Sequence, residues 1–113
     1  MNDYVFLYRS PPSPALSPQQ MEDRMGRWNH WFRDLEKRGA LANLGHPLQH
    51  AGGGVVRDKA GTISDGPFAE TKDIVIGFSV VTARSFDEAV SFATACPVFD
   101  QGGVVEVRQI AKM

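Results

Sequence analysis

"IVIGFSVVT", residues 74–82, has the clearest strand pattern of the whole chain. Because successive side chains of a strand point to opposite faces, one face would carry large apolar residues and the other small ones. The large residues are Ile74, Ile76, Phe78 and Val80, and the small ones are Val75, Gly77, Ser79 and Val81. Residues 4–9 have three aromatic side chains on one face and Val5 and Leu7 on the other. Both segments are therefore predicted to be strands with apolar residues on both faces.

A helix is predicted between these two strands, starting just after Ser17. Ser17 is a favourable N-cap, Pro18 suits the first helical position, and Gln20 completes a capping box. Apolar side chains then recur at intervals of three and four residues, the spacing of one helix face. This stripe consists of Met21, Met25, Trp28, Phe32 and Leu35, with Trp31 beside it. Gly39 is the predicted stop.

The remaining elements complete a known order. Residues 41–50 are predicted to form a strand broken at residues 45–47, and residues 55–57 and 62–64 a hairpin across DKAG. A second helix is predicted to begin after Ser85 and to end at Pro97. Its inner stripe would be Phe86, Ala89, Val90 and Ala93. With residues 104–110 as the last strand, the order is βαββαβ plus an extra central hairpin, which is typical of a ferredoxin-like α+β sheet.

Two helices can cover only one face of a four-stranded sheet. The other face would expose the apolar residues of both central strands to water, and this exposure is energetically unfavourable. A second copy of the same sheet is the simplest cover. We therefore expect a homodimer in which two sheets form a dimeric α+β barrel.

Length and composition restrict the class of protein. The 113 residues suit a single domain, 1–113, and 42% hydrophobic with 22% charged residues is ordinary for a soluble globular protein. The net charge of −1 gives no basic field for direct nucleic-acid binding, and no apolar run is long enough to span a membrane. The one cysteine, Cys96, cannot form an internal disulfide, so a cytoplasmic location is expected.

A second stretch, "DGPFAETKD" at residues 65–73, is more specific than any of these patterns. Together with the following "GF", the helix "SFDEAVSFA", the "CP" pair and the terminal "GGVVEVRQI", it resembles the YCII-related family, and within it the DGPF-domain proteins. The resemblance extends over nearly the whole chain. It implies a dimeric α+β barrel with a cleft near the DGPF loop, and for some members an association with extracytoplasmic-function sigma factors.

The resemblance also implies a histidine on the first helix that acts with an aspartate as an acid/base pair. Here the matching position holds Trp28. The nearest histidine, His30, follows two residues later and would lie on the far side of the helix, because each residue turns it by about 100°. The chain therefore departs from the family pattern at this position.

Asp65, Gly66 and Pro67 have two interpretations. As a turn, Asp65 would accept backbone N–H groups, Gly66 and Pro67 would set the backbone, and Phe68 would anchor the loop. As a site, Asp65 would face a cleft and act as a general base or as an anchor for a donor group. Glu70 and Lys72 would then tune its charge, or else form a solvated pair of little energetic weight.

Three residues of the first helix are further candidates for ligand binding. Trp28 and Trp31 either pack in the core or form the apolar wall of a pocket. Arg24 falls within the apolar stripe, so its guanidinium either extends past the sheet edge into solvent or pairs with a carboxylate such as Asp65.

No metal site and no cofactor are predicted. His46 and His50 lie four residues apart in an extended segment, where they do not share a face as they would on a helix. Cys96 is expected to be a small buried residue rather than a nucleophile. "AGGGV" lacks the Lys-Ser/Thr and the helix of a phosphate-binding loop.

Two functions follow from the sequence. The first is a small-molecule site centred on Asp65, with Trp28, Trp31 and Phe68 as its apolar wall and, if it is catalytic, with proton-transfer or elimination chemistry. The second is a non-enzymatic binding or regulatory module that engages another protein, such as a sigma factor. An apolar cavity would favour the first, and a solid core with Asp65 bound to backbone N–H groups the second.

Overall fold

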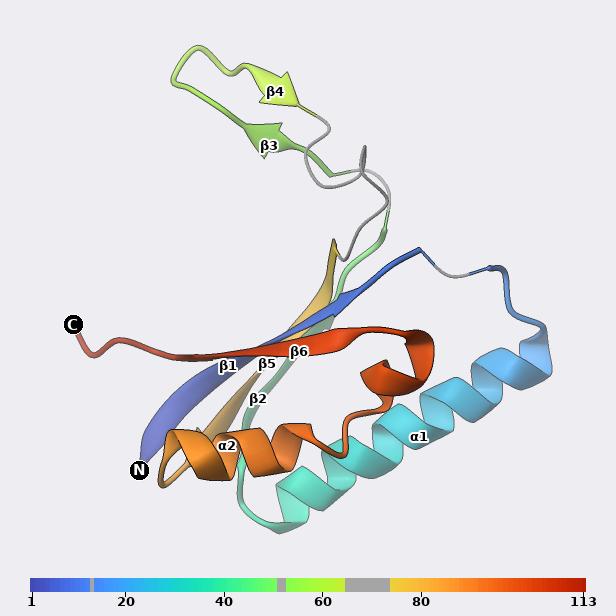
Figure 1. The fold of residues 1–113 in the computed structure, drawn as a ribbon, viewed down its shortest axis with the longest axis vertical. Helices are drawn as coiled ribbons and strands as arrows, with labels where there is room; N and C mark the ends of the chain where they lie inside the picture. The colour runs from blue at the N-terminus through green and yellow to red at the C-terminus, as the bar shows by residue number, and fades with distance from the viewer. Residues whose placement is uncertain (13, 51–52, 65–73) are drawn as a thin grey trace.

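The computed structural model describes residues 1–12, 14–50, 53–64 and 74–113. Within them a four-stranded antiparallel sheet has the order β2–β5–β1–β6. Its strands are β1 (Asn2–Ser10), β2 (Leu41–Pro47), β5 (Ile74–Ala83) and β6 (Val104–Gln109). The other elements are α1 (Pro18–Lys37), the hairpin of β3 (Val55–Val56) and β4 (Ile63–Ser64), α2 (Phe86–Ala93) and the short 3-10 helix η2 (Pro97–Gln101). The predicted ferredoxin-like α+β order with an extra central hairpin is confirmed (Figure 1).

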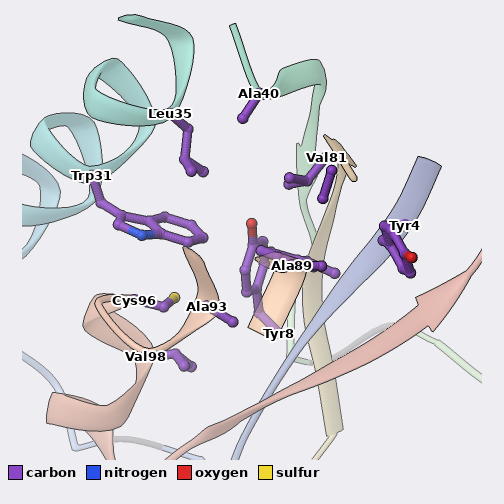
Figure 2. Packing of buried hydrophobic residues seen from close by; sticks show 12 residues of the cluster. Tyr4, Tyr8, Trp31, Leu35, Ala40, Val81, Ala89, Ala93, Cys96 and Val98 are labelled. Carbon is purple, nitrogen blue, oxygen red and sulfur yellow. The ribbon is translucent and has the colours of Figure 1, made fainter. Parts of the chain in front are cut away.

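Both helices pack on the same face of the sheet. The covered face carries the buried rings of Tyr4, Phe6 and Tyr8 from β1 and the small side chains of Ser79 and Val81 from β5. Small residues on β5 leave room for the aromatic side chains that the neighbouring elements contribute. Figure 2 shows this core, in which Trp31 of α1 lies between its own helix and the sheet.

A β-bulge corrects one part of the strand prediction. The pairing of β1 with β5 shifts between Tyr8 and Arg9, so that Tyr8 is opposite Gly77 whereas Arg9 is opposite Val75. The extra residue, Ile76, reverses the alternation of side chains. Ile74 is consequently buried on the helix-covered face and does not share a face with Phe78 and Val80.

The signals for the start and end of α1 are confirmed. The Ser17 side chain accepts a hydrogen bond from the backbone N–H of Gln20, whose own side chain accepts from the Ser17 N–H. Gly39, just past the end, has a φ of 70°, in the left-handed region that glycine tolerates. The predicted stripe is only partly buried, because contact with the core begins at Trp28 and leaves Met21 and Met25 exposed.

The predicted inner stripe of α2 was also wrong in part. Ser85 caps the helix as expected, and Ala89 and Ala93 are fully enclosed. Phe86 is half exposed and Val90 more than a third exposed. The two alanines let the helix approach the sheet closely, and Phe86 and Val90 lie at the edges of this narrow contact. The chain then continues into η2, which begins at Pro97.

The face of the sheet away from the helices carries apolar side chains. Val5 and Leu7 from β1 and Phe78 and Val80 from β5 are half-buried on it. An ion pair between Arg9 and Glu106 crosses the same face at 3.1 Å. The homodimer inferred from this face stays a prediction. No helix of the described segments is both long and apolar enough to cross a membrane.

Candidate functional site

A cleft of about 400 Å³ lies between helix α1 and the edge strand β2, and we call it the α1–β2 cleft. Helix α1 contributes Arg24, Met25, Trp28, Asn29 and Phe32. The strands contribute Leu44, Gly45, His46 and Pro47 from β2, Ile76, Gly77, Phe78 and Ser79 from β5, and Tyr8 from β1. Gln101, the last residue of η2, completes the lining. Its size and its aromatic walls are those of a site for a small organic molecule.

Aromatic side chains form the inner wall of the cleft. The rings of Tyr8 and Trp28 meet edge to face with their centroids 5.0 Å apart, and Trp28 and Phe32 lie 5.8 Å apart. His46 and Phe78 also line the cleft from the strand side, with their ring centroids 6.1 Å apart, although the Phe78 side chain belongs to the face of the sheet away from the helices. Aromatic pairs at these distances and tilts are attractive and hold each other's orientation. The wall is therefore preformed.

The indole of Trp28 is held by a hydrogen bond. Its Nε1–H donates to Oε1 of Gln101 at 2.9 Å, which connects α1 to η2 across the side of the cleft. A half-buried tryptophan normally needs such a partner for its N–H. No local sequence pattern predicts this hydrogen bond, because the two residues are 73 positions apart in the chain.

Strand β2 follows an irregular path beside the cleft because of Gly45. Its φ is 73°, and an added Cβ would lie 1.7 Å from the backbone oxygen of Phe78. The carboxamide of Asn43 accepts a hydrogen bond from the Gly45 N–H at 2.8 Å, in the region where the pairing with β5 shifts register. Such a bulge bends an edge strand and redirects its side chains. Only glycine fits this close approach.

The hydroxyl of Tyr8 is the most unusual polar group in the lining. The residue is 4% exposed, and its hydroxyl has no hydrogen-bond partner among the described residues. The adjacent Ser79 hydroxyl donates to the carbonyl of Leu44 at 2.6 Å. Burial raises the pKa of Tyr8 well above its ordinary value, and the nearby Ser79 hydroxyl, whose geometry does not make a hydrogen bond with the Tyr8 hydroxyl, lowers that pKa only in part. Tyr8 is therefore a neutral hydrogen-bond donor across the physiological pH range.

Arg24 also lines the cleft. Its side chain is half-buried, and Nε is enclosed without a hydrogen-bond partner in the part of the chain that the structure describes. The suggested partner, Asp65, lies outside the described residues. A guanidinium is always charged, so Arg24 brings a fixed positive charge to a lining whose other members are neutral or apolar side chains and one histidine.

The other candidates from the loop also lie outside the described residues. They are Gly66, Pro67, Phe68, Glu70 and Lys72. Residues 65–73 precede β5 directly in the chain, and β5 lines the cleft with Ile76 and the three residues after it.

Trp31 and His30 lie away from the α1–β2 cleft. Trp31 is buried in the core, where its Nε1–H donates to the carbonyl of Phe92 at 3.1 Å. Both residues line a different, open hollow of about 900 Å³ between α1 and residues 94–100, the α2–η2 segment that follows α2 and includes most of η2. Of the three candidates predicted on the first helix, Arg24 and Trp28 therefore line the α1–β2 cleft, whereas Trp31 is buried in the core and does not line it.

Sequence reasoning identified only Arg24 and Trp28 among the cleft residues, and the residues that it missed include Tyr8, Phe32, His46 and Gln101. Tyr8 and Phe32 were expected only as core residues, since a strand face or helix stripe does not show which members border a cleft. No metal-binding group of three or more His, Cys, Asp or Glu side chains occurs in the segments described. Cys96 is buried, and burial raises the pKa of its thiol to about 12, so it is not a reactive thiolate.

Comparisons with known proteins show which family this chain is related to. The model of the YCII-related domain matches residues 4–113. The uncharacterized protein R00369 of Rhizobium meliloti (strain 1021) is 35% identical over 81 residues, which are 70% of this chain and 65% of that protein. The solved structure of 5-chloro-2-hydroxyhydroquinone dehydrochlorinase (TftG) from Burkholderia phenoliruptrix AC1100, in complex with 2,5-dihydroxybenzoquinone, is 24% identical, covers 90% of each chain and has a TM-score of 0.46. Because the domain model covers nearly all of the chain, the protein belongs to the YCII-related family.

Proposed function

We propose that the protein binds a small, largely apolar molecule in the α1–β2 cleft. The observation that carries this proposal is the combination of a preformed aromatic wall with the buried hydroxyl of Tyr8, which has no hydrogen-bond partner in the described part of the chain. Small-molecule sites are concave, mostly apolar and equipped with a few polar groups that orient the ligand.

For chemistry in this site we propose Asp65 as the acid/base group, with residues 66–72 as part of the rim. In support, the chain runs directly from this loop into β5, which lines the cleft. A carboxylate beside apolar walls gains basicity, because desolvation disfavours its charged form. Proton transfer or elimination is the reaction class that one such carboxylate supports without a cofactor.

A non-enzymatic regulatory module, for instance one acting with a sigma factor, is the second candidate. It is favoured by the helix residues at the cleft, where Trp28 takes the position expected for a catalytic histidine. His30 lines the hollow between α1 and the α2–η2 segment and does not line the cleft. An acid/base pair using a histidine of α1 is therefore not part of the first proposal.

The two tryptophans allow a direct test of binding. We expect small monocyclic compounds (toluene, phenol and benzoate) to shift the indole N–H resonance of Trp28 in two-dimensional NMR spectra. The Trp31 resonance should move much less, because that indole is buried and bonded to Phe92. Trp28→Phe would assign the two signals. Absence of any Trp28 shift with all three compounds at millimolar concentration would reject the small-molecule proposal.

The role of Asp65 is tested by the urea unfolding midpoint of Asp65→Ala at fixed protein concentration. If the carboxylate serves the site, we expect unchanged or higher stability, since functional residues often lower stability. A loss of about 1–2 kcal/mol would instead mean that Asp65 holds the backbone of its loop. Alanine is preferred to asparagine, because an Asn-Gly pair can keep the turn.

We also propose that the uncovered face of the sheet forms a homodimer. The half-buried Val5, Leu7 and Val80 support this, since apolar sheet faces are normally covered. Light scattering should give a dimer for the wild type and a folded monomer for Val80→Arg. Val90→Arg on α2, away from that face, is the matched control and should stay dimeric. A monomeric wild type, or a dimer that tolerates Val80→Arg, would contradict this interface.

A further inference from the structure

Two residues that line the α1–β2 cleft each carry a buried polar atom with no hydrogen-bond partner among the described residues. These atoms are the hydroxyl oxygen of Tyr8 and Nε of Arg24. Buried polar atoms are nearly always paired, because a buried donor without a partner loses its hydration without compensation. A pair of such donors at one cleft indicates that a ligand supplies the acceptors.

The chemistry of the two groups restricts what that ligand carries. Burial raises the pKa of Tyr8, so the side chain keeps its proton and can donate to an acceptor oxygen. Arg24 has donors only and a permanent positive charge. Among the described residues no acidic side chain lines the cleft, so a counterion for Arg24 would come from a ligand or from Asp65, which lies outside them. An anionic ligand would supply both the acceptor and the counterion.

The rest of the lining restricts the body of the ligand. Trp28 and Phe32 of α1 present ring faces and edges to a volume of about 400 Å³. Flat, unsaturated molecules make the best contacts with such walls, by stacking or edge-to-face packing. A saturated or strongly polar molecule would leave these side chains less well covered.

We propose that the ligand of the α1–β2 cleft is a small planar organic anion, such as an aromatic acid, whose acceptor oxygen binds the Tyr8 hydroxyl and whose charge is matched by Arg24. This rests on the proposed small-molecule function and names the class of molecule that it binds. It makes Tyr8 and Arg24 the residues that determine specificity.

The test compares benzoate with toluene, which has a similar shape and no charge, by following the Trp28 indole N–H resonance during titration. Benzoate should bind at least tenfold more tightly to the wild type. Tyr8→Phe removes only the hydroxyl and should weaken benzoate binding about tenfold, the usual effect of one lost hydrogen bond, with toluene changed less than twofold.

Arg24→Met removes the charge and keeps an unbranched apolar side chain. It should abolish the preference for benzoate over toluene. Arg27→Met on the same helix is the matched control, because Arg27 lies in the other hollow and pairs with Asp100 at 3.6 Å. The same charge is lost in that variant, yet the preference for benzoate should persist.

The unfolding midpoint of Tyr8→Phe gives an independent check. A hydroxyl that serves only the ligand should leave the midpoint of the free protein unchanged or higher. A lower midpoint would show a structural partner for the hydroxyl and overturn the proposal. Equal affinity for toluene and benzoate would also overturn the proposal of an anionic ligand, but small-molecule binding would still be supported. If no compound binds, both the anionic ligand and the small-molecule function are rejected.

Discussion

The indole Nε1–H of Trp28 donates to Oε1 of Gln101 at 2.9 Å and so joins the first helix to the segment before the last strand. Both residues line the α1–β2 cleft. The hydrogen bond fixes a side wall of the cleft by connecting elements that are far apart in sequence. It therefore affects both the stability of the fold and the shape of the site.

Gln101→Ala should destabilise the protein by about 1 kcal/mol, because it leaves the half-buried indole N–H without its acceptor. Gln101→Glu keeps an acceptor oxygen and should retain most of that stability. Urea unfolding of the three proteins measures the difference. If alanine and glutamate variants unfold together, the hydrogen bond does not contribute as the structure indicates.

Gly45→Ala should be among the most destabilising single changes in the chain. The new Cβ would lie 1.7 Å from the Phe78 oxygen, so β2 must move away from β5. Gly39→Ala is the matched control, because its φ of 70° is nearly the same as the 73° of Gly45. Apart from its chain neighbours, no described residue has an atom within 4 Å of the Cβ position of Gly39. We expect a loss of about 1–2 kcal/mol for Gly39→Ala, from backbone strain alone, and at least about 3 kcal/mol for Gly45→Ala. Similar losses in thermal or urea unfolding would contradict the close approach.

Gly26→Ala should stabilise the protein. Gly26 lies inside α1, and apart from the adjoining backbone of its own helix no atom of the described residues lies within 4 Å of the position that a Cβ would take. Alanine loses less backbone entropy than glycine in a helix, which is worth about 0.5–1 kcal/mol. A higher unfolding midpoint is the expected result. A lower midpoint would show that this side of α1 is covered by something that a methyl group displaces.

Cys96 should make stability fall at alkaline pH. Burial raises the pKa of its thiol from 9.0 to about 12, so above pH 9 the unfolded chain loses a proton that the folded protein keeps. The folded state then binds more protons, and the free energy of unfolding decreases as pH rises from 9 towards 12. Below pH 9 the thiol is protonated in both states and contributes no pH dependence.

The measurement compares the wild type with Cys96→Ala at pH 8 and pH 10.5. Between these two pH values, the free energy of unfolding should fall by roughly 2 kcal/mol more for the wild type than for the variant. A difference of one bound proton between the folded and unfolded states changes this free energy by about 1.4 kcal/mol per pH unit. The difference removes the contribution of other groups, including Tyr8. Equal losses would mean that the thiol ionises in the folded protein as readily as in the unfolded one.

The sequence predicted the elements whose signals are local. The capping box of Ser17 and Gln20, the glycine after α1 and the alternation of β1 depend only on residues close in the chain, so these predictions were confirmed. It failed where alternation is interrupted. Ile74 was assigned to the wrong face because Ile76 is an additional residue in the pairing of β5 with β1 and reverses the alternation. This bulge depends on the partner strand, so the sequence of β5 alone does not show it.

By itself, the sequence determined the order of the elements, the ferredoxin-like class and the family, since these depend on periodicity, capping and a specific motif. Only the tertiary structure decided which side chains share a cleft. Arg24 and Trp28 meet Tyr8, His46 and Gln101 there, whereas Trp31, three residues after Trp28, faces the core. The physical reason is that periodicity shows which face of an element is apolar, whereas a cleft forms where two such faces fail to fill the space between them.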